Sequence, residues 1–394
     1  MNRSPALLMT FALATLLAVA TPARADDAAV TGESPPLRVL SWNLHGVPLI
    51  RTRRAARLAA MPAAVVALER RSEASDPSTA SAPIDVLALQ EVWLDADAAT
   101  LTEAFRAAGW PHARRAPAGG LLTLSRGAIT EARFTAFDYP GKPLKPWHAD
   151  WFGGKGFDRM QVETAAGVVE LVNTHLQARF GSTEYDTFQL TQAIQLGAAL
   201  GPTPGKARPL IAVGDFNSRQ GHASTDTLLA MTGLTVTGAG MNIDLVLTRS
   251  GGARSPGSRA ARHVLTEPVE LPGGAPEPLS DHPGVLATIR FKATPATAEP
   301  PRASLAADHR ERVRARLKEA RDRVRRDRRL TALAVTLIAG ALGLLLRREM
   351  TRRRRVALLA VTLPALTLLL VQLLVDQPAT LEALEQALKR VGAG

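Results

Sequence analysis

The chain has 394 residues, a formal net charge of +12 and no cysteine. The absence of cysteine excludes disulfides, thiolate nucleophiles and cysteine-ligated zinc. Any metal must therefore be bound by oxygen or imidazole ligands, which suits Mg²⁺ or Mn²⁺. Residues 1–301 hold 28 Lys and Arg against 27 Asp and Glu, whereas residues 302–394 hold 20 against 9. A nucleic-acid enzyme more often spreads basic charge over its binding face, so the near-neutral main part predicts no nucleic-acid partner.

The N-terminus has the pattern of a secretory signal peptide at residues 1–25. Arg3 precedes the apolar run 6–20, and the small residues Ala23 and Ala25 suit a cleavage site. An uncleaved membrane anchor is the alternative interpretation. Residues 26–36 then form a polar leader.

Residues 37–292 are expected to form one globular domain. Short runs rich in Val, Leu and Ile predict buried strands at 37–43, 84–92, 121–125, 168–176, 209–217, 243–248 and 284–291. Residues 53–70 and 182–201 predict helices, and the polar stretch 70–83 predicts a surface loop. The pattern therefore indicates a mixed α/β core with more than one sheet.

A linker at 293–307 leads to a basic segment at 308–329, which lacks Gly and Pro and is predicted to be helical. We expect this helix either to lie on an anionic membrane surface or to form a solvated stalk. Two apolar segments follow, at 330–346 and 356–375, and their lengths suit a hydrocarbon core of about 30 Å. A pair of helices buried in a soluble core is the alternative.

The loop 347–355 between these segments contains six arginines in nine residues. The positive-inside rule places such a loop in the cytoplasm, so we expect a transmembrane hairpin in a bacterial inner membrane. The main domain and the tail 376–394 would then lie on the periplasmic side. The basic charge of 308–329 opposes this orientation, because it would also lie outside the cytoplasm.

Polar side chains lie at or beside the ends of most predicted strands. In chain order they are Asn43, Glu91, His175, Asp215 with Asn217, Asp244, and Asp281 with His282. Strand ends that meet at one rim of a sheet can share a pocket. Taken singly, each residue also suits a turn or a helix cap, but together they predict one site.

In this order the residues resemble the endonuclease/exonuclease/phosphatase superfamily of Mg²⁺-dependent phosphodiesterases. The matching motifs are SWN, LQE, NTH, GDFN, ID and SDH, which span residues 37–292. The resemblance implies a four-layer α/β/β/α sandwich of the DNase I-like type, with the site at one edge. The C-terminal hairpin would be an addition to that fold.

Hydrolysis of a phosphodiester needs charge neutralisation, an activated water and help for the leaving oxygen. Glu91 is expected to bind Mg²⁺, with Asn43 as a second ligand or an orienting group and Asp281 in support. His282 suits a general base, and the resemblance pairs it with Asp244. Asp215 and Asn217 are expected to position the nucleophile and the phosphate. His175 is expected to donate a hydrogen bond to the developing negative charge.

The stretch HADWFGGKG (148–156) bears on the substrate. It resembles membrane-bound neutral sphingomyelinases, in which an aspartate five positions before a lysine forms a polar pair at the site; here these are Asp150 and Lys155. Trp151 suits a lipid interface. A surface hairpin loop is the alternative interpretation of this stretch.

We therefore expect a phosphodiesterase that hydrolyses sphingomyelin or a related membrane phospholipid and works at the lipid bilayer. Three rival hypotheses stay open. These are an exported nuclease on the same scaffold, a phosphomonoesterase, and a catalytically silent membrane-anchored binding module.

Overall fold

The computed structural model describes residues 32–48, 53–75, 83–139, 141–142, 153–181, 184–201, 208–238, 241–252, 254–293, 305–347 and 350–392. The predicted signal peptide lies outside the described residues, and so do Asp150 and Trp151.

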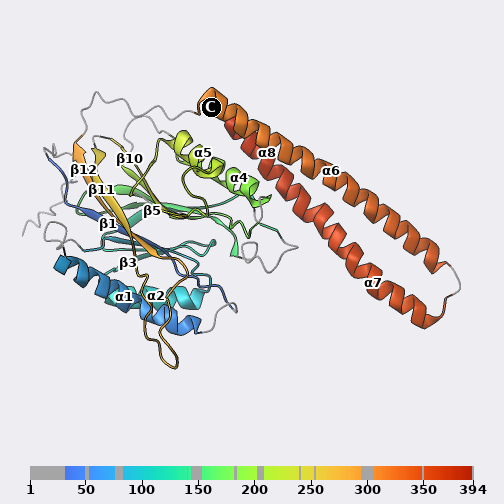
Figure 1. Ribbon diagram of the computed structural model, residues 1–394, viewed down its shortest axis with the longest axis horizontal. Coiled ribbons are helices and arrows are strands. Elements are labelled where there is room, and N and C mark those ends of the chain that lie inside the picture. Colours follow the sequence, from blue (N-terminus) through green and yellow to red (C-terminus); the bar gives the residue numbers. More distant parts are fainter. Residues whose placement is uncertain are drawn as a thin grey trace, which may run out of the picture.

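Two six-stranded sheets face each other at the centre of the main domain (Figure 1). The order in the first sheet is β11 (Arg254–Val264), β12 (Gly284–Ala293), β1 (Leu37–Asn43), β2 (Val86–Gln90), β4 (Leu122–Ser125) and β3 (His112–Arg115). The order in the second sheet is β5 (Ile129–Ala136), β6 (Gly156–Val162), β7 (Val169–His175), β8 (Leu210–Asp215), β10 (Asp244–Arg249) and β9 (Thr235–Val236).

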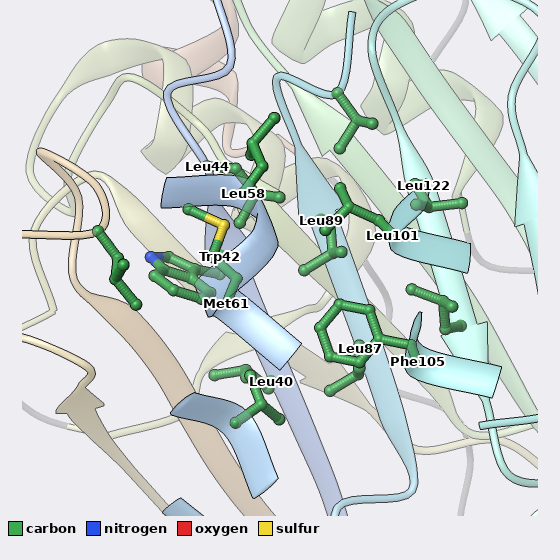
Figure 2. Close-up of a cluster of buried hydrophobic side chains, with 14 of the residues drawn as sticks. Leu40, Trp42, Leu44, Leu58, Met61, Leu87, Leu89, Leu101, Phe105 and Leu122 are labelled. Carbon is green, nitrogen blue, oxygen red and sulfur yellow. The ribbon is translucent and has the colours of Figure 1, made fainter. Parts of the chain in front are cut away.

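Helices cover the outer face of each sheet. The helices α1 (Arg54–Ser75) and α2 (Asp95–Ala107) pack on the first sheet through a buried cluster that includes Trp42, Met61 and Phe105 (Figure 2). On the second sheet lie α4 (Glu184–Ala199) and α5 (Ala223–Thr232). A further apolar cluster fills the space between the sheets. The predicted four-layer α/β/β/α sandwich is thus confirmed.

Strand register brings the predicted site residues to one edge. The pairs β1–β2 and β7–β8 are parallel, with Asn43 opposite Gln90 and His175 opposite Asp215. The antiparallel partner β10 begins at Asp244, which also lies opposite Asp215. Because carboxyl ends of parallel strands meet at the same edge, polar residues that terminate them gather there.

Two long C-terminal helices project away from the sandwich (Figure 1). The helix α6 (Ala307–Leu346) is continuous through the predicted basic helix and the first apolar segment. The next helix in the chain is α7 (Arg352–Val371), which runs through the π-helical turn η1 (Gln372–Asp376) into α8 (Gln377–Gly392). Both apolar stretches are long enough to cross a membrane, and almost none of either is buried against the rest of the chain. These helices indicate membrane association.

The basic half of α6 (residues 307–329) and α8 together form what we call the neck. Leu317 and Leu384 of the neck are fully buried in one cluster with Ile194 of α4. His309 Nε2 lies 3.0 Å from Thr227 Oγ1 of α5. Residues 308–329 are helical, as predicted, but they pack on the main domain and do not form a free solvated stalk; a position at an anionic membrane surface stays a prediction. Many of the basic side chains of this segment, such as Arg312, Arg314 and Arg326, are exposed.

Docking of the neck depends on Leu317, which is 0% exposed. We expect Leu317→Ala to weaken this docking by about 2–5 kcal/mol, because it removes buried methyl groups and leaves a cavity. Hydrogen exchange of the α8 amides should report the loss as faster exchange. The control is Leu333→Ala on the same helix, whose side chain is 55% exposed. Unchanged α8 protection in the Leu317 variant would contradict the assignment.

Candidate active site

The candidate site lies where β1, β2, β7 and β8 end and β10 begins. Three of its polar side chains, Asn43, His175 and Asp215, are at most 1% exposed. Buried polar groups are costly unless each has a partner. The contacts between them therefore define how the site is organised.

Asn43 hydrogen-bonds to two carboxylates. Its Nδ2 donates to Glu91 Oε1 at 3.1 Å and to Asp215 Oδ2 at 3.0 Å. Its Oδ1 accepts from the backbone N–H of His45 at 3.0 Å. Asn43 thereby brings Glu91 from the first sheet and Asp215 from the second into one cluster.

Glu91 has a left-handed backbone conformation, with φ of 60°. Such a conformation is uncommon for a residue with a side chain and concentrates at functional sites. The chain passes so close that a Cβ on Gly46 would lie 2.2 Å from the Glu91 carbonyl oxygen. Only glycine therefore fits at position 46.

His282 and Asp244 form a pair at the rim, with 2.8 Å between Nδ1 and Oδ2. The other ring nitrogen, Nε2, faces Asp215 Oδ2 at 3.9 Å. Burial acts to lower the pKa of His282, but the hydrogen bond to Asp244 and the charges of Asp215, Asp244 and Asp281 raise the pKa to about 9. Burial and the charge of Asp215 raise the pKa of Asp244 to about 6.

A second histidine lies deeper in the site. His175 Nε2 is 2.6 Å from Lys155 Nζ and 3.4 Å from Asp215 Oδ2. Nε2 can accept from the Lys155 ammonium in one tautomer of His175 or donate to the Asp215 carboxylate in the other. Burial acts to raise the pKa of Asp215, but His175, His282 and Lys155 lower it far below its ordinary value.

Two predicted residues hold loops in place. Asn217 donates from Nδ2 to the Leu176 carbonyl at 3.0 Å, and its backbone N–H donates to Asp215 Oδ1 at 2.8 Å. Asp281 is half exposed and pairs with Nδ1 of His45 at 2.9 Å. Burial acts to raise the pKa of Asp281, but the contact with His45 lowers it.

The chemistry of the cluster suits a divalent cation. Glu91 Oε2 is buried and has no hydrogen-bond partner among the residues that the structure describes. An oxygen of this kind is a natural ligand for a hard ion. A second group, Asp215, Asp244 and His282, offers ligand atoms that lie within 4.8 Å of one another. In that group, however, Asp244 and His282 already bond to each other.

The structure brings together most of the residues predicted from the sequence: Asn43, Glu91, Lys155, His175, Asp215, Asn217, Asp244, Asp281 and His282. The predicted contact of Asp150 with Lys155 and the role of Trp151 lie outside the described residues. Sequence reasoning missed His45, although it follows the SWN motif by two positions. It also missed Trp93, two positions after Glu91, whose ring lies 5.7 Å from Lys155 Nζ.

The chain is similar in sequence to known proteins. The profile of the Endonuclease/Exonuclease/phosphatase family matches residues 40–282. A Drosophila melanogaster protein named "Putative neutral sphingomyelinase" is 27% identical over 296 residues, which cover 67% of this chain and 63% of the relative. The inositol phosphosphingolipids phospholipase C of Schizosaccharomyces pombe is 28% identical over 192 residues, which cover 47% of this chain and 42% of the relative.

Among solved structures, sphingomyelinase C from Streptomyces griseocarneus is 21% identical, with a TM-score of 0.47, and the match covers 65% of this chain and 99% of that chain. The matched part of this chain covers less than two thirds of the length of each of the two sequence relatives, 63% of the Drosophila protein and 42% of the yeast protein.

Proposed function

Because the chain belongs to the Endonuclease/Exonuclease/phosphatase family, we propose that it is a Mg²⁺-dependent phosphodiesterase of the sphingomyelinase or phospholipase C type. Its substrate would be sphingomyelin or a related membrane lipid, cleaved to a ceramide-like product and a phosphorylated headgroup. The observation that carries the proposal is the His282–Asp244 pair at 2.8 Å, facing Asp215 in the cluster that holds Glu91.

His282 would act as the general base on the attacking water. Asp244 binds Nδ1, which leaves Nε2 directed toward Asp215 and the open side of the site. This contact sets the ring orientation, as carboxylates do for catalytic histidines. His282 must be neutral to accept a proton, so positive charge brought into the cluster assists catalysis by lowering the pKa of His282.

Glu91 would hold the Mg²⁺ ion, with Asn43 orienting its carboxylate through Nδ2 and Asp281 in support through His45. When bound, the ion neutralises charge on the phosphate and stabilises the leaving oxygen. Lys155 and His175 would place further positive charge at the non-bridging oxygens. Asn217 would keep the loop after β8 in position. Mn²⁺ suits the same oxygen ligands.

The membrane helices support a lipid substrate. Exposed apolar side chains such as Leu344 and Val361 suit contact with lipid tails. The neck packs on the sandwich, so anchoring of α6 and α7 would hold the site near the bilayer surface and raise the local concentration of substrate. We place the main domain on the periplasmic side of an inner membrane, because the arginines at 352–355 fit the cytoplasmic side.

A substrate panel tests the proposal. The full chain in detergent is given sphingomyelin, ceramide phosphoinositol, phosphatidylcholine and duplex DNA, with Mg²⁺ or with EDTA. We expect Mg²⁺-dependent release of a phosphorylated headgroup from at least one sphingolipid and no nicking of DNA. DNA cleavage without lipid turnover would show a nuclease instead, and turnover of phosphomonoesters alone would show a phosphatase.

A further inference from the structure

The candidate active site is assembled from both sheets. Asn43 ends β1 of the first sheet and donates to Asp215, which ends β8 of the second sheet, at 3.0 Å. His282 lies just before β12 of the first sheet and contacts Asp244, the first residue of β10 in the second sheet, at 2.8 Å. The position of one sheet on the other therefore sets both contacts, and with them the place of Glu91 relative to the second half of the site.

The space between the sheets is filled mainly by apolar side chains. Ala88 of β2 and Leu171 of β7 belong to this apolar cluster. Burial of apolar area is favourable but has no direction, so it sets the position of one sheet on the other less sharply than a hydrogen bond does. Because side chains alternate along a strand, the residues two positions further on, Gln90 and Asn173, face the same interior.

A hydrogen bond joins these two amides across the gap between the sheets. Gln90 Nε2 donates to Asn173 Oδ1 at 2.8 Å, and both side chains are 0% exposed. Asn173 Nδ2 in turn donates to Thr123 Oγ1 of β4 in the first sheet at 3.3 Å. A second polar link lies beside the first, because Asp158, opposite Asn173 on β6, accepts from Arg114 Nε of β3 at 3.0 Å.

Stability alone does not explain the Gln90–Asn173 pair. Gln90 Oε1 is buried and has no hydrogen-bond partner among the residues that the structure describes. An unpaired buried acceptor costs free energy, whereas two apolar side chains of the same shape would leave none. The pair is adjacent to both halves of the site, since Gln90 immediately precedes Glu91 and Asn173 lies two residues before His175.

We propose that Gln90 and Asn173 are positioning residues, whose hydrogen bond fixes one sheet on the other so that Glu91 and His175 act on the same phosphate. The inference rests on the proposed function and adds to it the contact that sets the geometry of the site. Both amides are buried away from the substrate, so they act only through the residues that follow them. A displacement of about 1 Å at a reacting centre can lower the rate about 100-fold.

A double variant of the full chain separates positioning from stability. Gln90→Met/Asn173→Leu replaces both amides with apolar side chains of similar shape, whereas each single variant leaves one amide without its partner. We expect each single variant to lower the Tm and the double variant to recover most of the loss. The double variant should still hydrolyse sphingomyelin or ceramide phosphoinositol with a kcat about 10- to 100-fold below that of the wild type, at a similar KM. Recovery of kcat together with Tm would show a structural role and overturn the inference.

Calorimetry provides a second measurement, which requires no turnover. Binding of inorganic phosphate to the full chain in detergent is measured with and without Mg²⁺. In the wild type we expect Mg²⁺ to tighten phosphate binding by at least about 5-fold, because Glu91 would hold the ion and Lys155 with His175 the anion. In the double variant each ligand should bind alone as in the wild type, but the coupling factor should fall to about 1.

Thr237→Val/Thr248→Val is the matched control. It removes a buried hydroxyl pair, 3.3 Å apart, next to the edge strand β9, and it should leave both kcat and the coupling factor unchanged. Coupling that persists in Gln90→Met/Asn173→Leu overturns the inference even where lipid is hydrolysed. Coupling that is lost in this variant, with no lipid turnover by the wild type, supports the inference and overturns the proposed function.

Discussion

Replacing His282 with alanine is expected to lower kcat by about 10²- to 10⁴-fold, the usual contribution of a general base. The fold should persist, because the His282 side chain is 19% exposed and its removal leaves no enclosed cavity. Initial rates of headgroup release at saturating Mg²⁺ give the effect, and thermal unfolding checks the fold. His263→Ala serves as the control, since this histidine is exposed on β11. A variant that keeps more than a tenth of the activity would exclude His282 as the base.

The pH dependence of activity distinguishes the role of His282 as the base from that of Asp244, which positions it. Activity should rise with pH as His282 loses its proton, because only the neutral ring accepts one. Asp244→Asn removes a negative charge that, together with Asp215 and Asp281, raises the pKa of His282 to about 9, so the pKa falls. The acidic limb of the profile should therefore move to lower pH while kcat decreases. A profile that keeps its position would show that another group titrates.

Central strands were predictable because they are buried on both faces. Every residue of β1 and β8 is buried, which produces the runs rich in Leu, Val and Ile seen in the sequence. The short strand β3 reads HARR and the long edge strand β11 contains Pro256 and a register shift, and neither has an apolar pattern. Edge strands bury little side-chain surface, so sequence patterns indicate them weakly.

The order of the motifs predicted which residues form the site, but it did not predict which of these residues contact one another. Lys155 reaches His175 because the next residue, Gly156, pairs with His175 across β6 and β7. That register depends on a strand for which the sequence had shown no signal. The contact of His45 with Asp281 likewise joins β1 to the segment before β12. Contacts between distant segments require the sheet topology, which composition and periodicity do not specify.

The charge pattern of the neck did not reveal that its basic helix packs on the main domain. A helix with many arginines reads as solvated or membrane-bound, yet α6 buries Val313 and Leu317 against α4. Arg325 pairs with Glu385 of α8 at 2.9 Å, and Arg390 of α8 pairs with Asp138 at 2.6 Å. Exposed pairs contribute little energy, so the apolar face supplies most of the docking. The predicted tail 376–394 is thereby largely a helix that supports the main domain.

Glu91→Gln is expected to weaken Mg²⁺ binding by at least about 100-fold, since loss of a mere supporting group near a metal already costs about 10- to 100-fold. The amide keeps the shape of the side chain and still accepts from Asn43 Nδ2, so the fold should be preserved. Two titrations with Mg²⁺ measure the effect, one of activity and one of thermal stability. A ligand that binds only the folded state stabilises it by about 2.7 kcal/mol at 100 times its Kd, and this gain should vanish in the variant. Glu103→Gln, which changes an exposed acid on α2, is the control. Should Glu91→Gln retain both responses, the ion must bind elsewhere, and the group of Asp215, Asp244 and His282 becomes the place to test.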